Sequence, residues 1–355
     1  MVKKKKNKNK RFFIKFTTSM LLVFILIGGF KAYQMYKVVE EPNVNLNGQQ
    51  SSFIYIPTGS DYLDLTTILY ESGIIINRSS FEWVAEKKNY PTNVKPGRYE
   101  IKESMSNNEL VNLLRSGRQT PVKLVFNKVR TKEVFAGIIA KQIEADSAEL
   151  VIKLNNHKFL SKYSKNKETA MTLFIPNTYE LYWNTNAESF VARMNKEYER
   201  FWNDKRRKKA TEIGMTPDEV ITLASIVEEE TIKNDEKEAL AGVYVNRLKK
   251  NIRLGADPTV RFALGDFNIK RILNKHLEYQ SPYNTYRNSG LPPGPICLPS
   301  ITTIDAVLNY EKHKYLYFCA KDDFSGYHVF AKTLKQHNQN AAKFHRALNN
   351  ARIYR

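Results

Sequence analysis

The sequence predicts an α+β protein that a single N-terminal helix anchors in a membrane. Three observations support this prediction. An apolar stretch follows a basic N-terminus, short strand-then-helix patterns recur after it, and the second half combines helical patterns with loops rich in Pro, Gly, Tyr and Asn. We therefore expect a transmembrane helix, a small β/α module and a larger mixed α+β domain. With 355 residues, of which 42% are hydrophobic, the chain is long enough for two or three domains.

The N-terminus has the pattern of a membrane anchor. Residues 1–11 form a basic tail, and residues 12–36 predict a transmembrane helix with Lys15 and Lys31 reaching toward the two headgroup layers. A membrane span needs about 20 residues, and the excess of Lys and Arg before this one predicts a cytoplasmic N-terminus. A cleaved signal peptide is the alternative, but no small-x-small cleavage site follows Gly29.

The formal net charge of +20 raises the question of nucleic acid as a partner. The densest basic run outside the tail, Lys205–Lys209, falls in a helix predicted from Ala187 through Lys209. A membrane anchor would separate this run from nucleic acid, so we expect a solvated helix face and no nucleic-acid partner. Cys297 and Cys319 either pair or remain buried free thiols, because no zinc or redox spacing is present.

The anchor is followed by a predicted linker and a small module. Residues 37–52 are short of apolar residues and hold a cluster of Asn, Gln, Gly and Ser, which is typical of a linker. In residues 53–118, Phe53–Ile56 and Gly97–Ile101 predict two strands. A Ser-x-x-Glu capping box that begins at Ser106 predicts the start of the helix after the second strand.

A second strand-turn-helix unit is predicted at residues 119–168, with Val122–Phe126 as its strand and a helix that runs through Ile143. Such units resemble LysM-type glycan-binding modules, and Phe53–Gly117 is the better match. The resemblance implies affinity for sugars. A membrane-proximal spacer domain without such affinity is the alternative.

Three adjacent carboxylates end the most clearly marked helix of the chain. Thr216 begins this helix with a Thr-x-x-Glu capping box, followed by Pro in the first turn, and the pattern continues to about Lys233. Helical spacing places Glu228 and Glu230 on the two borders of an apolar stripe, while Glu229 points away from it.

A border carboxylate that is half desolvated and close to like charge has a raised pKa, which suits a general acid. The alternative is a charged helix end, with two solvated glutamates and one ion pair to Arg247 or Arg253.

Three conformationally restricted loops follow this helix, at Ala256–Val260, Ser281–Tyr286 and Gly290–Ile296. The first is expected to be an extended turn in which the carboxylate of Asp257 is hydrogen-bonded locally. The second offers stacking faces and an amide suited to sugars, on Tyr283, Asn284 and Tyr286. Together, the loops predict a rigid groove for a bulky neutral polymer.

These residues resemble the YceG-like family of endolytic peptidoglycan transglycosylases, which are single-pass membrane enzymes of the bacterial envelope. The resemblance covers most of the chain, including the basic tail, the span and the LysM-like region. Its other segments are Phe174–Tyr179, Leu223–Thr231, Val245–Leu248, Asp257–Val260, Ser281–Tyr286, Gly290–Ile296, Tyr315–Phe318, and Gly326–Phe330 with His337 and Asn338.

The resemblance implies that residues 169–355 form the catalytic domain, with Glu228 as the catalytic acid/base and Glu230 as a supporting acidic residue. Two departures from the family pattern are Glu229, which replaces a basic residue, and Ser300, which replaces Gly. No cofactor or metal is expected, because the histidines lack the spacing of a metal pair; His328 and His337 are expected mainly to pack or hydrogen-bond. The candidate glycan-binding residues are Asp257, Thr259, Tyr283, Asn284, Tyr286, His328, His337 and Asn338.

The implied reaction cuts the bond between N-acetylmuramic acid and N-acetylglucosamine. Glu228 would protonate the linking oxygen and then deprotonate the muramoyl C6 hydroxyl, whose attack on C1 leaves a 1,6-anhydro end. The enzyme would limit the length of nascent strands outside the bacterial plasma (inner) membrane. Its partners would be glycan strands, membrane lipid and the synthases of elongation or division. The alternatives are a hydrolytic muramidase and a non-catalytic wall-binding scaffold.

Overall fold

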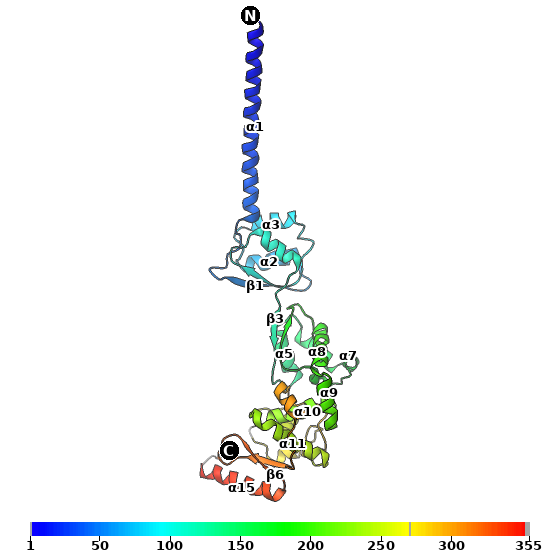
Figure 1. Ribbon diagram of the computed structural model, residues 1–355. Helices are drawn as coiled ribbons and strands as arrows, with labels where there is room; N and C mark the ends of the chain where they lie inside the picture. The colour runs from blue at the N-terminus through cyan, green and yellow to red at the C-terminus, as the bar shows by residue number, and fades with distance from the viewer. Residues whose placement is uncertain (1, 270, 352–355) are drawn as a thin grey trace. The chain divides into compact units, whose positions relative to one another are not determined.

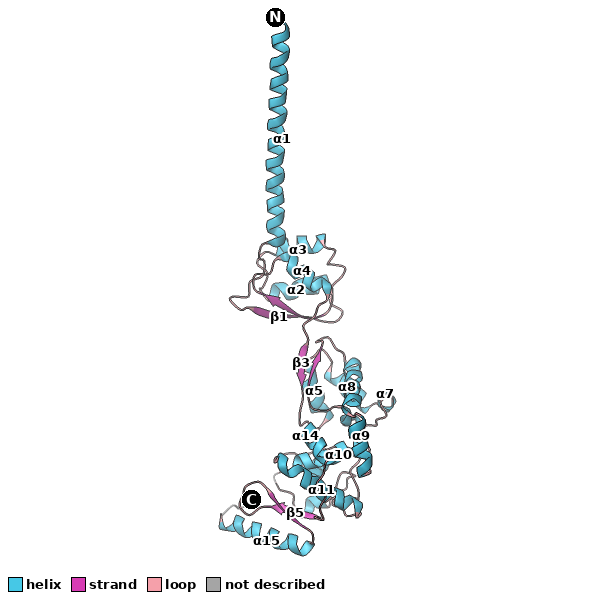
Figure 2. Cartoon of the chain, viewed as in Figure 1, coloured by secondary structure: helices cyan, strands magenta, loops and turns pink. Residues whose placement is uncertain are grey.

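The computed structural model describes residues 2–269 and 271–351. The side chains of residues 1–9, which make up most of the predicted basic tail, lie outside the described part. Helices and short antiparallel strand pairs make up the chain, as Figures 1 and 2 show, and this mixed content confirms the α+β class.

The chain forms two compact units, each with its own hydrophobic core. Unit 1 comprises residues 1–121 with a short return at 182–184. Unit 2 comprises residues 122–181 and 185–355.

The predicted tail and membrane span belong to one continuous helix, α1 (Val2–Glu40). Within it, Lys10–Glu40 is long and apolar enough to cross a membrane. The helix extends beyond the predicted boundary at residue 36, because Val38 and Val39 pack against the core of unit 1.

The folded part of unit 1 is built around one strand pair. β1 (Ser51–Ile56) pairs antiparallel with β2 (Gly97–Lys102), so that Ser51 lies opposite Lys102 and Ile56 opposite Gly97. Two helices connect the strands and a third follows them. These are α2 (Tyr62–Glu71), α3 (Arg78–Lys87) and α4 (Asn107–Ser116). The Ser106 capping box is present at the start of α4, as predicted.

The predicted linker at residues 37–52 is part of unit 1. Val44 is 1% exposed and Leu46 is 5% exposed, and both belong to the core. Composition did not predict this packing, because only two apolar side chains, surrounded by polar residues, hold the segment against the core. The order strand, helix, helix, strand fixes the architecture of unit 1, whereas sugar affinity of a LysM-like module stays a prediction.

Unit 2 begins with β3 (Val122–Val125), which pairs antiparallel with β4 (Thr178–Leu181). The stretch at 119–168, predicted as a second small unit, therefore does not stand alone. The Phe135 ring packs against the Phe174 ring at a tilt, with centroids 4.4 Å apart, so its helix shares a core with the later residues. The elements between β3 and β4 are α5 (Lys132–Ala140), α6 (Ser147–Asn155), α7 (His157–Ser161) and the 3-10 helix η1 (Ala170–Leu173).

The basic helix predicted from 187 to 209 is two helices, α8 (Ala187–Phe201) and α9 (Asp204–Ile213). The break occurs because the Asn203 side chain caps α9 by accepting from the Arg206 backbone amide. The Arg206 guanidinium donates two hydrogen bonds of 2.9 Å to Asp305. Part of the basic run is thus neutralised inside unit 2.

The helix that ends in three glutamates, α10 (Pro217–Glu230), lies at the centre of unit 2. The predicted apolar stripe is buried, but the opposite side of the helix is buried as well from Val220 to Val227, so the burial is not one-sided. It packs against α11 (Lys237–Lys249), α12 (Asp257–Leu264) and α14 (Ile301–Leu308). Two short helices flank these, η2 (Asn234–Glu236) beside α11 and α13 (Asn274–Leu277) beside α12.

The C-terminal part of unit 2 contains the helix α12 and a strand pair covered by a helix. Asp257 and Pro258 begin α12 instead of forming the predicted extended turn. The chain then ends in an antiparallel pair, β5 (Tyr317–Ala320) with β6 (His328–Ala331), against which α15 (Leu334–Asn350) packs (Figure 2).

Candidate active site

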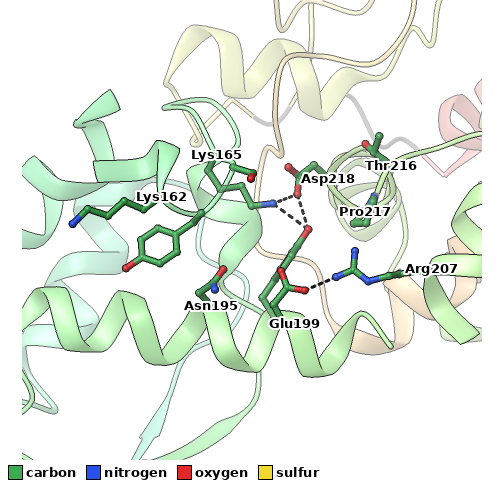
Figure 3. Close-up of a pocket in the computed structure, with 11 residues that line it drawn as sticks. Lys162, Lys165, Asn195, Glu199, Arg207, Thr216, Pro217 and Asp218 are labelled. Atoms are coloured by element: carbon green, nitrogen blue, oxygen red, sulfur yellow. Dashed lines mark hydrogen bonds and ion pairs between the residues drawn. The ribbon is translucent and has the colours of Figure 1, made fainter. Parts of the chain in front are cut away.

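A polar cluster fixes the start of α10 (Figure 3). The Lys165 side chain is 4% exposed, and its ammonium contacts the Asp218 carboxylate and the Tyr198 hydroxyl, the latter at 3.0 Å. Thr172 and Tyr198 also donate to Asp218, at 2.8 and 3.0 Å. Burial lowers the pKa of Lys165, and the Asp218 carboxylate opposes that effect. Since the buried charges are paired, this cluster holds the helix in place.

At the other end of α10, the three glutamates enter three different environments. The Oε2 atom of Glu228 accepts hydrogen bonds from the Lys237 ammonium at 3.1 Å and the Ser300 hydroxyl at 2.9 Å, and from the Thr303 hydroxyl. Burial acts to raise the pKa of Glu228, but the Thr303 hydroxyl and the Lys237 charge outweigh it and hold that pKa below its ordinary value. The raised pKa expected for one of the two border carboxylates is therefore not found at Glu228.

Helical spacing predicted that the Glu229 side chain points away from the apolar stripe. In the structure this side chain is instead buried, with 6% of it exposed. It forms an ion pair of 2.7 Å with Arg130 and lies 3.8 Å from the Lys128 ammonium. Both cations come from the loop between β3 and α5. This glutamate ties the end of α10 to the first part of unit 2.

Glu230 lines an open cleft of about 540 Å³. The Tyr244 hydroxyl, on α11, donates to its Oε1 atom at 2.7 Å. Burial raises the pKa of Glu230 to about 7; the Tyr244 hydrogen bond opposes the rise, and the nearby Asp257 carboxylate adds to it. Of Glu228 and Glu230, it is therefore Glu230 whose pKa favours a bound proton near neutral pH.

The other polar groups of the cleft come from loops and helices distant in sequence. The Tyr286 hydroxyl donates to Asp257 Oδ1 at 2.6 Å. The His337 ring stacks on Tyr317 with centroids 5.5 Å apart, and burial, helped by the charge of Arg247, lowers the pKa of His337. The full lining is Glu230, Arg247, Ile252, Arg253, Gly255, Asp257, Tyr286, Tyr317, Phe318, Leu334 and His337.

Arg247 organises one wall of this cleft. Its Nε donates to the Leu316 carbonyl and its Nη1 to the Leu254 carbonyl, both at 2.6 Å. Gly255 lies against it with a positive φ of 56°, and a Cβ there would come within 3.5 Å of Nη1. A contact of this length is ordinary, so it is the left-handed backbone that favours glycine at this position.

The structure thus brings four predicted site residues to one cleft: Glu230, Asp257, Tyr286 and His337. Glu228 does not line it. Thr259 and Asn284 are fully buried, so the expected contact of these two side chains with glycan does not fit this structure. The Asn284 amide donates to the Leu277 and Tyr279 carbonyls and thereby shapes its own loop.

The remaining candidates lie elsewhere in unit 2. Tyr283 packs its ring on Phe262 at 4.8 Å. His328 Nδ1 lies 2.9 Å from Glu236 Oε2, which agrees with the hydrogen-bonding role expected for this histidine. Asn338 is exposed on α15.

Sequence reasoning missed Tyr244, Lys237 and Thr303, which set the pKa values of the glutamates. Each lies on another helix than α10, so no local spacing marked it. Among the described residues, no group of three or more His, Cys, Asp or Glu side chains is arranged to hold a metal ion. Cys297 and Cys319 are both free thiols.

Comparison with known proteins places this geometry in context. The model of the YceG-like family matches residues 54–343, which span both units. The chain belongs to the YceG-like family. This assignment agrees with the resemblance noted in the sequence.

Relatives with an assigned name point the same way. The chain is 29% identical over 339 residues to the endolytic murein transglycosylase of Bacillus subtilis, covering 90% of this chain and 91% of that one. It is 28% identical over 369 residues to the endolytic murein transglycosylase of Streptococcus pneumoniae, where the match spans 94% of this chain but 65% of the relative. The crystal structure of a putative YceG-like protein from Listeria monocytogenes superposes with a TM-score of 0.55 at 31% identity, covering 82% of this chain and 99% of that one.

Proposed function

We propose that this protein is a membrane-anchored endolytic murein transglycosylase in which Glu230, and not Glu228, supplies the catalytic proton. The observation that supports this choice is the cleft itself. Glu230 opens into it with a pKa of about 7, whereas Glu228 is bound by an ammonium and two hydroxyls with a lowered pKa. A general acid must hold a proton near the working pH and reach the substrate, and Glu230 meets both requirements.

In the proposed reaction, a glycan strand lies in the cleft with the oxygen between N-acetylmuramic acid and N-acetylglucosamine at Glu230. Tyr244 occupies Oε1, so we place the proton on Oε2. Glu230 gives this proton to the leaving oxygen as the C1–O bond breaks. The resulting carboxylate then takes the proton of the muramoyl C6 hydroxyl, whose oxygen attacks C1 and closes the 1,6-anhydro ring.

Asp257 and Tyr286 act as a pair in this proposal. Tyr286 holds the Asp257 carboxylate at 2.6 Å. A fixed negative charge there stabilises the positive charge that develops at C1 as the bond breaks. The same charge raises the pKa of Glu230, so that one carboxylate serves both the proton donor and the transition state.

The presence of two carboxyl groups in one cleft also supports a second candidate, a hydrolytic muramidase. In that reaction Asp257 would activate water or attack C1, and the products would carry reducing ends. A wall-binding scaffold without catalysis is a third possibility, in which Glu230 would contact glycan without transferring a proton.

The proposed setting follows from α1. We place its N-terminus in the cytoplasm and both units outside the plasma membrane of a bacterium. There the enzyme would cut nascent strands internally and limit their length. Peptidoglycan synthases of the elongation or division machinery are the partners that this reaction would require nearby.

The test compares Glu230→Gln with Glu228→Gln. The full-length chain in detergent is incubated with uncrosslinked peptidoglycan strands, and the product ends are identified by mass spectrometry. We expect internal fragments with 1,6-anhydro ends from the wild type, and a loss of about 10²–10⁴-fold in rate for Glu230→Gln, the usual contribution of a general acid.

The Glu228→Gln variant, assayed at a temperature where circular dichroism shows it folded, should retain most of the turnover. If Glu228→Gln is inactive while folded and Glu230→Gln is active, the roles are the reverse of those proposed. Reducing ends would indicate the muramidase, and no cleavage by any form would favour the scaffold.

A further inference from the structure

The outer end of the membrane helix is built into unit 1. The side chain of Asn107, which is 1% exposed, donates to the Val38 carbonyl at 2.8 Å. The Asn108 amide donates to Glu40 Oε1 at 2.9 Å. Because α1 has no break before these contacts, the length of the helix sets the distance between unit 1 and the bilayer.

The register of the helix in a bilayer follows from its charges. Between Lys15 and Lys31 the helix has no charged residue, and its apolar side chains remain exposed from Phe16 to Met35. A hydrocarbon layer of about 30 Å takes about 20 residues of helix. A span that begins at Phe16 therefore ends close to Met35, with the Lys31 ammonium reaching along the helix to the headgroups, and Val38 lies about one turn beyond, among the headgroups.

A groove of about 390 Å³ opens at this level, between the end of α1 and the start of α3. Figure 1 shows α3 beside the end of α1, and the two helices are in contact. Beside the groove, Ile76 is 62% exposed. The lining residues are Gln34, Met35 and Val38 from α1, and Asn77, Ser79, Ser80 and Trp83 from α3.

We propose that this groove lies in the headgroup layer of the outer leaflet and holds the glycerol end of a membrane phospholipid, with Trp83 as the interfacial side chain. The inference rests on the membrane anchoring proposed above. Tryptophan favours this layer because its ring is apolar and its N–H is polar. Met35 and Val38 belong to the membrane helix itself, so lipid is already adjacent to the groove.

Apolar contact, and not headgroup charge, selects the ligand. On α3 the cations Arg78 and Lys87 are balanced by the anions Glu82 and Glu86. The Lys87 ammonium lies 5.7 Å from the centre of the Trp83 ring, which keeps a positive charge near the phosphate of any phospholipid. We therefore expect the groove to accept zwitterionic and anionic phospholipids about equally.

The test measures tryptophan fluorescence of the full-length chain in bilayer nanodiscs. The discs contain phosphatidylcholine brominated either near the glycerol or near the chain end, because bromine quenches tryptophan at short range. Wild type is compared with Trp83→Phe and with Trp183→Phe, which removes the other tryptophan of unit 1.

We expect quenching that is stronger for bromine near the glycerol, that is lost in Trp83→Phe, and that remains in Trp183→Phe. Replacing part of the unbrominated lipid with an anionic phospholipid should leave the quenching of Trp83 fluorescence unchanged. Trp83 emission that no brominated lipid quenches would overturn the proposal, because the groove would then face water, a second copy or another protein. Quenching that appears only with anionic lipid would also contradict it. The readout does not use catalysis, so its outcome is independent of the proposed reaction.

Discussion

Glu228 and Glu230 lie two residues apart on α10, yet their pKa values shift in opposite directions. Both carboxyl groups lose water on folding. Glu228 gains an ammonium and two hydroxyl donors, whereas Glu230 gains one tyrosine hydroxyl and a neighbouring carboxylate. Burial acts to raise both pKa values; at Glu228 the ammonium and the hydroxyl donors outweigh it, whereas at Glu230 the Tyr244 hydroxyl does not.

The pH dependence of cleavage should report the titration of Glu230. Its folded pKa of about 7 lies above that of a free glutamate, so the proton is present below pH 7 and is lost as the pH rises through that value. We expect kcat/KM to fall above about pH 7, and to fall about tenfold per pH unit well beyond it. Because the Asp257 charge raises the pKa of Glu230, Asp257→Asn should shift the fall in kcat/KM to lower pH. If the fall stays at the same pH in this variant, a group other than Glu230 causes it.

Replacing Glu228 should affect stability more than chemistry. Glu228→Gln leaves the Lys237 ammonium, 5% exposed, without its counter-charge. Removing one partner of a buried ion pair costs about 3 kcal/mol or more. Because the folded pKa of Glu228 is lowered, the wild-type advantage should be present above the usual pKa of glutamate and lost as the pH falls through the lowered value.

Urea unfolding of Glu228→Gln and wild type at pH 7 and at acidic pH would measure this difference. The matched control is Glu219→Gln at the start of the same helix, where the carboxylate belongs to an exposed capping box. An equal loss in both variants would argue against a special role for the buried pair.

At the scale of elements, the loop that precedes the cleft wall depends on one buried amide. The Asn284 side chain donates to two carbonyls, and its Oδ1 accepts from the Tyr286 backbone amide at 3.0 Å. This arrangement fixes the backbone of Tyr286, whose hydroxyl holds Asp257. The loop residue that sequence reasoning assigned to the glycan thus positions the residues that line the cleft.

Replacing Asn284 with Ala should therefore reduce both stability and turnover. The loss of two part-buried hydrogen bonds costs about 0.5–1.5 kcal/mol each, and a displaced Tyr286 would lower kcat more than it changes KM. Thermal unfolding and initial rates would measure the two effects. Asn288→Ala, which removes an exposed amide bonded to the same loop, should cost less than about 1 kcal/mol. A normal kcat with a raised KM in Asn284→Ala would instead support direct binding.

At the scale of the whole molecule, two cores predict two unfolding steps. Phe81 and Phe135 are both fully buried, the first in unit 1 and the second in unit 2. Truncating a buried phenylalanine to Ala costs about 3–5 kcal/mol. We expect two calorimetric transitions for the full-length chain. Phe81→Ala should lower the midpoint temperature of one of them, and Phe135→Ala that of the other.

Cleavage should follow the unit 2 transition alone, because the cleft residues all belong to unit 2. Phe81→Ala should therefore cleave soluble glycan fragments at a nearly normal rate. A single transition that shifts equally in both variants would show that the two units unfold together.

Local sequence determined the long apolar N-terminal helix, the capping boxes at Ser106 and Thr216, the strands of unit 1 and the family. Each of these depends on hydropathy or on contacts between residues a few positions apart. The family resemblance also predicted a site at the end of α10, from an ordered series of matching segments along the chain.

Only the tertiary structure decided which glutamate opens into the cleft. The partners of Glu228 and Glu230 come from α11, α14 and the loop before α14, and burial of α10 on all sides removes the one-sided stripe from which the orientations were predicted. The same holds for Val44 and Leu46, which join a core that their polar neighbours concealed. Hydrophobic spacing reports the face of an element, whereas the pKa of a carboxyl group depends on which distant donors and charges the fold brings to it.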